Sequence, residues 1–215
     1  MSTEETDDST KYVVIAAIAF FFLRGSSRSA RRNRANVRAS FPAAVQTRSD
    51  TPREEWWLQT YDLALQAAEE FLPNSTAAQH RLFALAVATL AANETGQGES
   101  EWSNNPGNLV SAPDATGRAM LPGNEVYAVF ADTRAGVRAM ARLLASASRY
   151  RPALQALLAP RSLTAAAAIP AWAYAVSVAG YTEPAPARTR FQEVIRRLVA
   201  TGQRILSIND AQLQG

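Results

Sequence analysis

The apolar pattern predicts two consecutive helices in the first half of the chain. In the first, 53–71 (REEWWLQTYDLALQAAEEF), apolar residues recur at spacings of three and four, which places them on one face of a helix. A break follows at Pro73, and Ser75 or Thr76 can cap the second helix, 77–93. Its sequence, AAQHRLFALAVATLAAN, is apolar nearly all round, so we expect this helix to be buried on every side.

The helical pattern stops after the second helix. Residues 93–124 are rich in Gly, Pro, Asn and Ser, which is typical of loops. The segment EVYAVF, 125–130, then alternates in the manner of a strand, and NLVS, 108–111, is the candidate partner strand. We therefore expect a small hairpin inserted between helices.

Helical spacing returns after this strand and predicts four more helices. Asp132 or Thr133 can cap the first of them, and Ser162 or Thr164 can begin the third. We expect the last to end at Gly202. The four helices cover 134–148, 153–159, an alanine-rich segment that Gly180 stops, and 187–202. The predicted fold class is therefore mainly α with a small β-hairpin region.

The chain begins with an acidic tail followed by an apolar segment. Residues 1–11 carry four acids against one lysine and show no apolar periodicity, which is typical of a solvated tail. Residues 12–23 (YVVIAAIAFFFL) form an unbroken apolar run that, with the flanking Lys11 and Arg24, can serve as a short membrane anchor helix. A cleaved signal peptide and a buried core helix are the alternatives, and the acidic start disfavours the signal peptide.

A basic segment follows the apolar run. Seven arginines and no acid lie within residues 24–48, so we assign 24–55 to an unfolded basic linker. This linker can contact anionic lipid or nucleic acid without sequence specificity. By the positive-inside rule, the charges place the C-terminal side of the anchor on the cytoplasmic face, and this orientation fits a virus particle with an internal membrane.

Composition limits the available chemistry. The 215 residues include no cysteine and one histidine, which excludes disulfides, thiol catalysis and a histidine metal cluster. Because there is also no glycine-rich phosphate loop, we expect no metal or other cofactor. Hydrolysis would depend on carboxylates or hydroxyls. With 47% hydrophobic residues the chain can bury one core, which we assign to 56–206, followed by a C-terminal tail, 207–215.

Glu94 closes the predicted buried helix, in the segment ANETGQGES. One interpretation is an ordinary helix end with Gly96 and Gly98 as stop signals, where an acid is mildly unfavourable because of the helix dipole. The other interpretation is catalytic. A partly buried carboxyl at the negative end of a helix has a raised pKa, stays protonated near neutrality and can donate a proton to a glycosidic oxygen.

The order of four segments resembles the lysozyme-like endo-β-N-acetylglucosaminidases of glycoside hydrolase family 73. The segments are ANETGQGES, WSNNPGNLVS, EVYAVFADTRAGVRAMARLL and WAYAVSVAGYTEPAPARTRFQEVI, and the resemblance covers about residues 75–200. NNPGNL together with VFADTRAGVRA also resembles small phage virion proteins. The resemblance implies a lysozyme-like fold that cleaves peptidoglycan glycan strands.

The resemblance also implies roles for individual residues. Glu94 matches the catalytic acid, and Tyr181, in AGYTEP, matches a tyrosine beside the cleaved bond. Two further groups match substrate-binding positions. The loop amides that would meet N-acetyl groups are Asn104, Asn105 and Asn108, and the aromatic rings that would face sugars are Trp102, Tyr127 and Tyr174. For each aromatic residue, packing in the core or anchoring of a loop is the alternative.

Retaining and inverting glycosidases need a second carboxylate near the acid. Glu125 is the first candidate, because a hairpin facing the helix end can bring it across a cleft. Asp114, Glu99 and Glu101 follow as candidates. Without a second carboxylate, cleavage would proceed through the substrate's own N-acetyl group or by a lytic transglycosylase route, in which one glutamate acts as acid and then as base.

The predicted function is cleavage of β-1,4 bonds in peptidoglycan, by a glucosaminidase, muramidase or lytic transglycosylase acting in phage entry or cell-wall lysis. We expect the protein to be attached to a membrane by one N-terminal anchor, in a virion or a bacterial cell envelope. The alternatives are a catalytically inactive lysozyme-like domain that binds the wall or builds the virion, and a protein that contacts DNA through the arginine-rich linker.

Overall fold

The computed structural model describes residues 41–44, 51–99, 101–120, 125–159, 164–181 and 188–214. Residues 42–215 form one compact unit. The predicted acidic tail and membrane anchor, and the basic linker as far as residue 40, lie outside the described residues. In the described part of the chain, no helix has both the length and the apolar character needed to cross a membrane.

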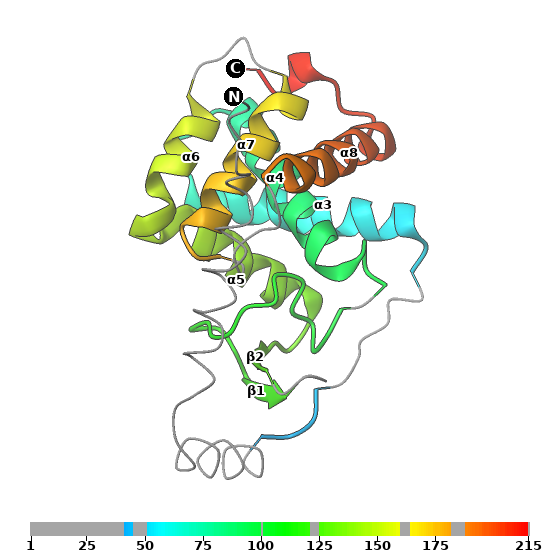
Figure 1. Ribbon diagram of the computed structural model, residues 1–215, viewed down its shortest axis with the longest axis vertical. Coiled ribbons are helices and arrows are strands. Elements are labelled where there is room, and N and C mark those ends of the chain that lie inside the picture. Colours follow the sequence, from blue (N-terminus) through cyan, green and yellow to red (C-terminus); the bar gives the residue numbers. More distant parts are fainter. Residues whose placement is uncertain are drawn as a thin grey trace, which may run out of the picture. The chain divides into compact units, whose positions relative to one another are not determined.

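The unit is mainly helical with one small antiparallel sheet, as the apolar pattern predicted (Figure 1). The described helices are α3 (Arg53–Phe71), α4 (Ala77–Thr95), α5 (Thr133–Ser146), α6 (Arg151–Leu158), α7 (Ala165–Val178) and α8 (Arg188–Leu206). The strands are β1 (Gly117–Met120) and β2 (Val126–Val129), and short 3-10 turns cover Ser148–Tyr150 and Asp210–Gln212.

Helix α4 forms the centre of the core. Every residue from Leu82 to Ala92 is buried, and α3, α6, α7 and α8 all pack against this helix. Two predicted caps are confirmed: Thr76 begins α4 with a reciprocal pair of hydrogen bonds to Gln79, and Asp132 caps α5. Because α4 is buried from Leu82 to Ala92, Glu94 lies where the helix leaves the core and the following loop begins.

The hairpin contains the predicted strand but a different partner. β2 pairs with β1, GRAM, in the register Gly117↔Val129 to Met120↔Val126, so the prediction that NLVS is the partner strand was wrong. NLVS approaches β2 through one backbone bond, from Ala128 N to Leu109 O at 2.8 Å. The sequence GRAM lacks an apolar alternation strong enough to be recognised.

Part of the predicted linker belongs to the folded unit. Met120 N donates to Pro42 O at 2.9 Å, and Ala44 N donates to Met120 O at 2.9 Å, so this segment lies along the edge of β1. Helix α3 then begins at Arg53. The folded unit therefore starts before the boundary at residue 56 that the composition suggested.

The C-terminal end also differs from the prediction. α8 continues past Gly202 to Leu206, so the expected helix end at Gly202 was wrong. Gly202 is buried, and a Cβ there would lie 2.7 Å from Cζ3 of Trp57, so this glycine allows α8 to pack closely on α3. The predicted tail packs as well: Leu213 is 4% exposed, and Oδ1 of Asp210 accepts a bond from Ala165 N at the start of α7.

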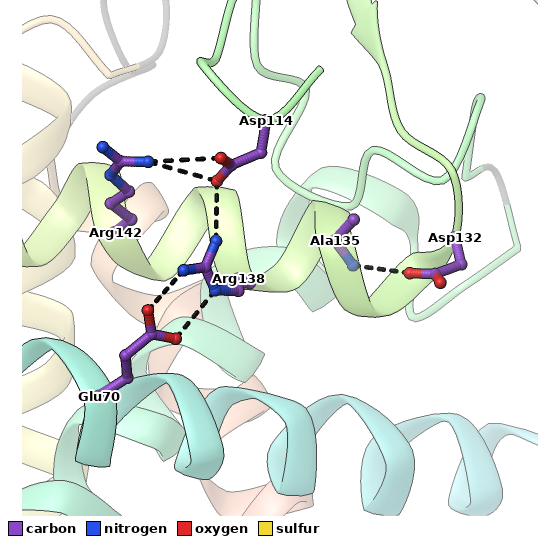
Figure 2. A network of polar contacts seen from close by, with 6 residues as sticks. All are labelled: Glu70, Asp114, Asp132, Ala135, Arg138 and Arg142. Atoms are coloured by element: carbon purple, nitrogen blue, oxygen red, sulfur yellow. Dashed lines mark hydrogen bonds and ion pairs between the residues drawn. The ribbon is translucent and has the colours of Figure 1, made fainter. Parts of the chain in front are cut away.

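A network of charged residues joins α3, α5 and the loop before β1 (Figure 2). Arg138 on α5 donates through Nε to Oε2 of Glu70 on α3 at 2.9 Å and through Nη1 to Oδ2 of Asp114 at 3.0 Å. Arg142, one turn further along α5, also reaches Asp114 at 3.4 Å. The bonds from Arg138 lower the pKa of Glu70. The network holds the loop that leads into the hairpin against the helices.

Candidate active site around Glu94

Glu94 lies in the last turn of α4 and is partly buried. Nδ2 of Asn108 donates to Oε2 of Glu94 at 3.1 Å and to the backbone oxygen of the same residue at 3.4 Å. A longer contact, 3.5 Å, joins Nδ2 of Asn93 to Oε1 of Glu94. Among the described residues, no arginine, lysine or histidine forms an ion pair with this carboxyl.

The environment of Glu94 favours the neutral acid. Burial raises the pKa of the carboxyl, and the hydrogen bonds from Asn108 and Asn93 offset only part of this rise. The position at the C-terminal end of α4 acts in the same direction, because the negative end of the helix dipole disfavours a carboxylate. Glu94 therefore has the properties of a proton donor rather than those of a surface charge.

Tyr181 is distant from Glu94 in the sequence but contacts the same loop in the folded unit. It follows Gly180 (φ +90°) just after α7, and its hydroxyl donates to the backbone oxygen of Gly107 at 2.9 Å. Its ring lies edge-on to Tyr150, with centroids 6.2 Å apart. Burial raises the pKa of the Tyr181 phenol well above its usual value, and the negative charge of Glu94 raises it further. The two residues that the resemblance assigned to catalysis are both bonded to the dipeptide Gly107-Asn108, Tyr181 through Gly107 and Glu94 through Asn108.

Close packing fixes the loop that carries the asparagines. Ser103, Asn104 and Asn108 all have positive φ, between +48° and +57°, a region that asparagine tolerates better than most residues. Helix α5 approaches this loop at Gly136, where a Cβ would lie 1.9 Å from the backbone oxygen of Asn104. Only glycine permits this approach, so α5 presses directly on the backbone of the loop.

The three asparagines predicted to bind substrate have three different environments. Asn105 is 2% exposed, and its amide bonds to Leu109 N, Leu109 O and Ala128 O, so it anchors the loop to β2 and is turned away from solvent. Asn104 donates to the backbone oxygen of Phe130 at 3.1 Å. Asn108 alone contacts Glu94.

The predicted aromatic residues are all partly exposed. Trp102 lies in the loop after α4, and Tyr174 lies on α7, where it packs against the core. Tyr127 lies on β2, and its hydroxyl donates to Oε2 of Glu125 at 2.7 Å. Each ring keeps some surface that a ligand could cover.

The four candidates for a second carboxylate have partners elsewhere. Glu125 is exposed just before β2 and accepts the bond from Tyr127. Asp114 belongs to the charged network of Arg138 and Arg142, and Glu99 pairs with Arg53 at 3.6 Å. Glu101 is 3% exposed and accepts a bond from Thr133 at 3.3 Å.

Glu101 is thus a second buried acid. Burial raises the pKa of its carboxyl, and the nearby Trp56 and the hydroxyl of Thr133 partly offset the rise. It lies in the loop after α4 and contacts Thr133, the first residue of α5, whereas the donors around Glu94 are Asn108 and Asn93. Its position in a polar, glycine-rich segment had not distinguished it from an exposed loop acid.

Comparison of the chain with protein-family models, curated proteins and solved structures found no significant match. The resemblance to the lysozyme-like glucosaminidases therefore stays a prediction from the order of the motifs. The residues in contact with Glu94 or Tyr181 that the sequence analysis did not single out are Asn93, Gly107 and Tyr150.

Proposed function

We propose that this protein cleaves β-1,4 glycosidic bonds of peptidoglycan glycan strands on a lysozyme-like domain, with Glu94 as the general acid. The observation that carries the proposal is the carboxyl of Glu94, which is partly buried at the end of the core helix, accepts a hydrogen bond from Asn108, forms no ion pair with the described residues and has a raised pKa. An acid of this kind is what protonation of a leaving glycosidic oxygen requires.

In the proposed reaction, neutral Glu94 donates its proton to the bridging oxygen as the bond from that oxygen to C1 of the sugar breaks. Positive charge then develops at C1. The hydroxyl proton of Tyr181 points to Gly107, so the lone pairs of the phenol oxygen can face this charge. The bonds from Tyr181 to Gly107 and from the adjacent Asn108 to Glu94 support this arrangement, because they connect the tyrosine to the acid through two consecutive residues.

The partners of the four described candidates for a second carboxylate favour a route with one carboxylate. Glu94, now ionised, accepts the proton from the sugar's own C6 hydroxyl, whose oxygen attacks C1 and closes a 1,6-anhydro ring. No water is consumed, and Glu94 regains its proton for the next cycle. This is the lytic transglycosylase route. A hydrolase would instead release a reducing end, with water as the attacking group.

Mass spectrometry of the products released from purified peptidoglycan by the full chain tests the proposal. We expect anhydro ends from the wild type, none from Glu94→Gln, and unchanged release from Glu69→Gln, an exposed acid on α3 that serves as the control. If the wild type instead releases reducing ends and Glu125→Gln is inactive, the one-carboxylate route is rejected. The enzyme would then be a hydrolase that uses two carboxylates. Binding to insoluble peptidoglycan without release of products would reject catalysis in favour of a wall-binding role.

The segments outside the described residues support a membrane-attached setting. We include in the proposal that residues 12–23 anchor the enzyme in a virion membrane or bacterial envelope, where a phage would use it during entry or lysis. Residues 24–48 would contact anionic lipid or nucleic acid. We expect this binding to weaken steeply with salt and to disappear on deletion of 24–40, which leaves Pro42–Ala44 in place beside β1.

A further inference from the structure

Asn108 differs from the other asparagines of its loop because its amide nitrogen lies within hydrogen-bond distance of two oxygens of Glu94. Nδ2 lies 3.1 Å from Oε2 and 3.4 Å from the backbone oxygen of Glu94. An amide nitrogen has two protons to donate, so Nδ2 of Asn108 can donate to both of these oxygens. Asn108 therefore directs its donor group to Glu94, which is a role beyond the substrate contact that the sequence suggested.

The backbone around Asn108 is held from three sides. Its own N donates to Asn105 O at 3.2 Å, and its φ is +48°. The preceding Gly107 accepts the bond from Tyr181, and a Cβ on Gly107 would lie 2.8 Å from Oη of Tyr181 and 2.9 Å from Cγ of Met140. The dipeptide Gly107-Asn108 thus connects the acid of α4 to the tyrosine that follows α7.

We propose that Asn108 is a positioning residue that holds the carboxyl of Glu94 in one orientation and directs its proton to Oε1. This inference rests on the proposed function of Glu94. A carbonyl oxygen accepts a hydrogen bond better than the hydroxyl oxygen of a neutral acid, so Asn108 keeps Oε2 as the carbonyl oxygen. The hydroxyl is then at Oε1, where the contact from Nδ2 of Asn93 is longer, at 3.5 Å, than the 3.1 Å bond from Asn108 to Oε2, and the proton at Oε1 is the one to be donated to the substrate.

The same bond stabilises the ionised form that follows proton donation. Hydrogen bonds to a carboxylate are stronger than hydrogen bonds to a neutral acid, so Asn108 opposes the effect of burial on the pKa of Glu94. Asn108 thereby helps Glu94 to alternate between acid and base, as the one-carboxylate route requires. Its role is to orient and tune Glu94, without itself touching the reacting atoms.

The test is a ¹³C NMR titration of the Glu94 carboxyl in the full chain, with the signal assigned by its absence in Glu94→Gln. Asn108→Gly removes the amide and suits a positive φ, and Asn108→Asp keeps the size but places a second carboxyl beside the first. We expect the pKa of Glu94 to rise in Asn108→Gly and to rise further in Asn108→Asp. The matched control is Asn104→Gly, in the same loop with φ +57°, which should leave the titration unchanged.

Kinetics distinguish positioning from substrate binding. Loss of a bond that orients the acid should lower kcat about tenfold in Asn108→Gly with KM unchanged. The proton-donating limb of the pH profile should move to higher pH with the pKa. An unchanged titration in both Asn108 variants, or a raised KM with unchanged kcat, would overturn the inference.

The titration separates this inference from the proposed function. If the wild type releases no products but the pKa of Glu94 rises in the two Asn108 variants, the catalytic proposal fails while the control of Glu94 by Asn108 stands. If the wild type is active and the titration does not respond to Asn108, the positioning role fails while the function of Glu94 stands.

Discussion

Gly136→Ala is expected to destabilise the protein, although alanine is the better helix former. Gly136 lies in the first turn of α5, where a Cβ would be 1.9 Å from the backbone oxygen of Asn104 and 2.9 Å from Cδ of Pro106. These neighbours are backbone and ring atoms, so no flexible side chain can swing away. The loop itself would have to retreat from α5 to reach an ordinary contact distance of about 3.5 Å.

The magnitude follows from two opposing effects. Replacing glycine by alanine inside a helix contributes about 1 kcal/mol of stability through helix propensity. Overpacking against a backbone that must shift costs about 3 kcal/mol, the upper end of the usual range. We therefore expect the free energy of unfolding to fall by about 2 kcal/mol, a substantial fraction of the 5–15 kcal/mol that is typical of folded domains.

Urea unfolding of the full chain, followed by tryptophan fluorescence, measures this change, since Trp56 and Trp57 are buried in the core. Gly117→Ala is the matched control, because no atom lies within 4 Å of the Cβ that it would add. We expect this control to change the free energy of unfolding by less than about 0.5 kcal/mol. A Gly136→Ala protein as stable as the wild type, or more stable, would refute the close approach of α5 to the loop.

Two further predictions concern buried polar groups. Asn105→Ala leaves the backbone groups of Leu109 and Ala128 without their side-chain partner. This should lower the free energy of unfolding by about 2 kcal/mol or more. Equal urea midpoints for the variant and the wild type would contradict the anchoring role of Asn105. Folding raises the pKa of Glu94, so the folded state binds this proton more tightly than the unfolded chain. The wild type should therefore lose stability as the pH rises from about 4.3, the pKa of glutamate in an unfolded chain, through the raised pKa of the folded state. Urea midpoints across this range should show a growing advantage of Glu94→Gln over the wild type, and a difference that stays constant with pH would argue against the raised pKa.

Local pattern was sufficient to find the helices and the candidate acid. The spacing of apolar residues marks α3 and α4, and Thr76 and Asp132 were recognisable as caps, because a helix depends on residues three and four positions apart. The end of the apolar pattern of α4 also indicated Glu94 as an acid at the margin of the core. These features involve only near neighbours in the chain, and a sequence contains that information directly.

The contacts that make the site depend on residues distant in the sequence. Asn104, Asn105 and Asn108 are the same residue type in one loop, yet they bond to Phe130, to backbone groups near β2, and to Glu94. No local pattern separates them, because each bond depends on which group the folded chain brings within about 3 Å. The strand that pairs with β2 and the packing role of Gly202 were not predicted for the same reason. Each depends on contacts with segments distant in the sequence, which override the local preference of a glycine or a short strand.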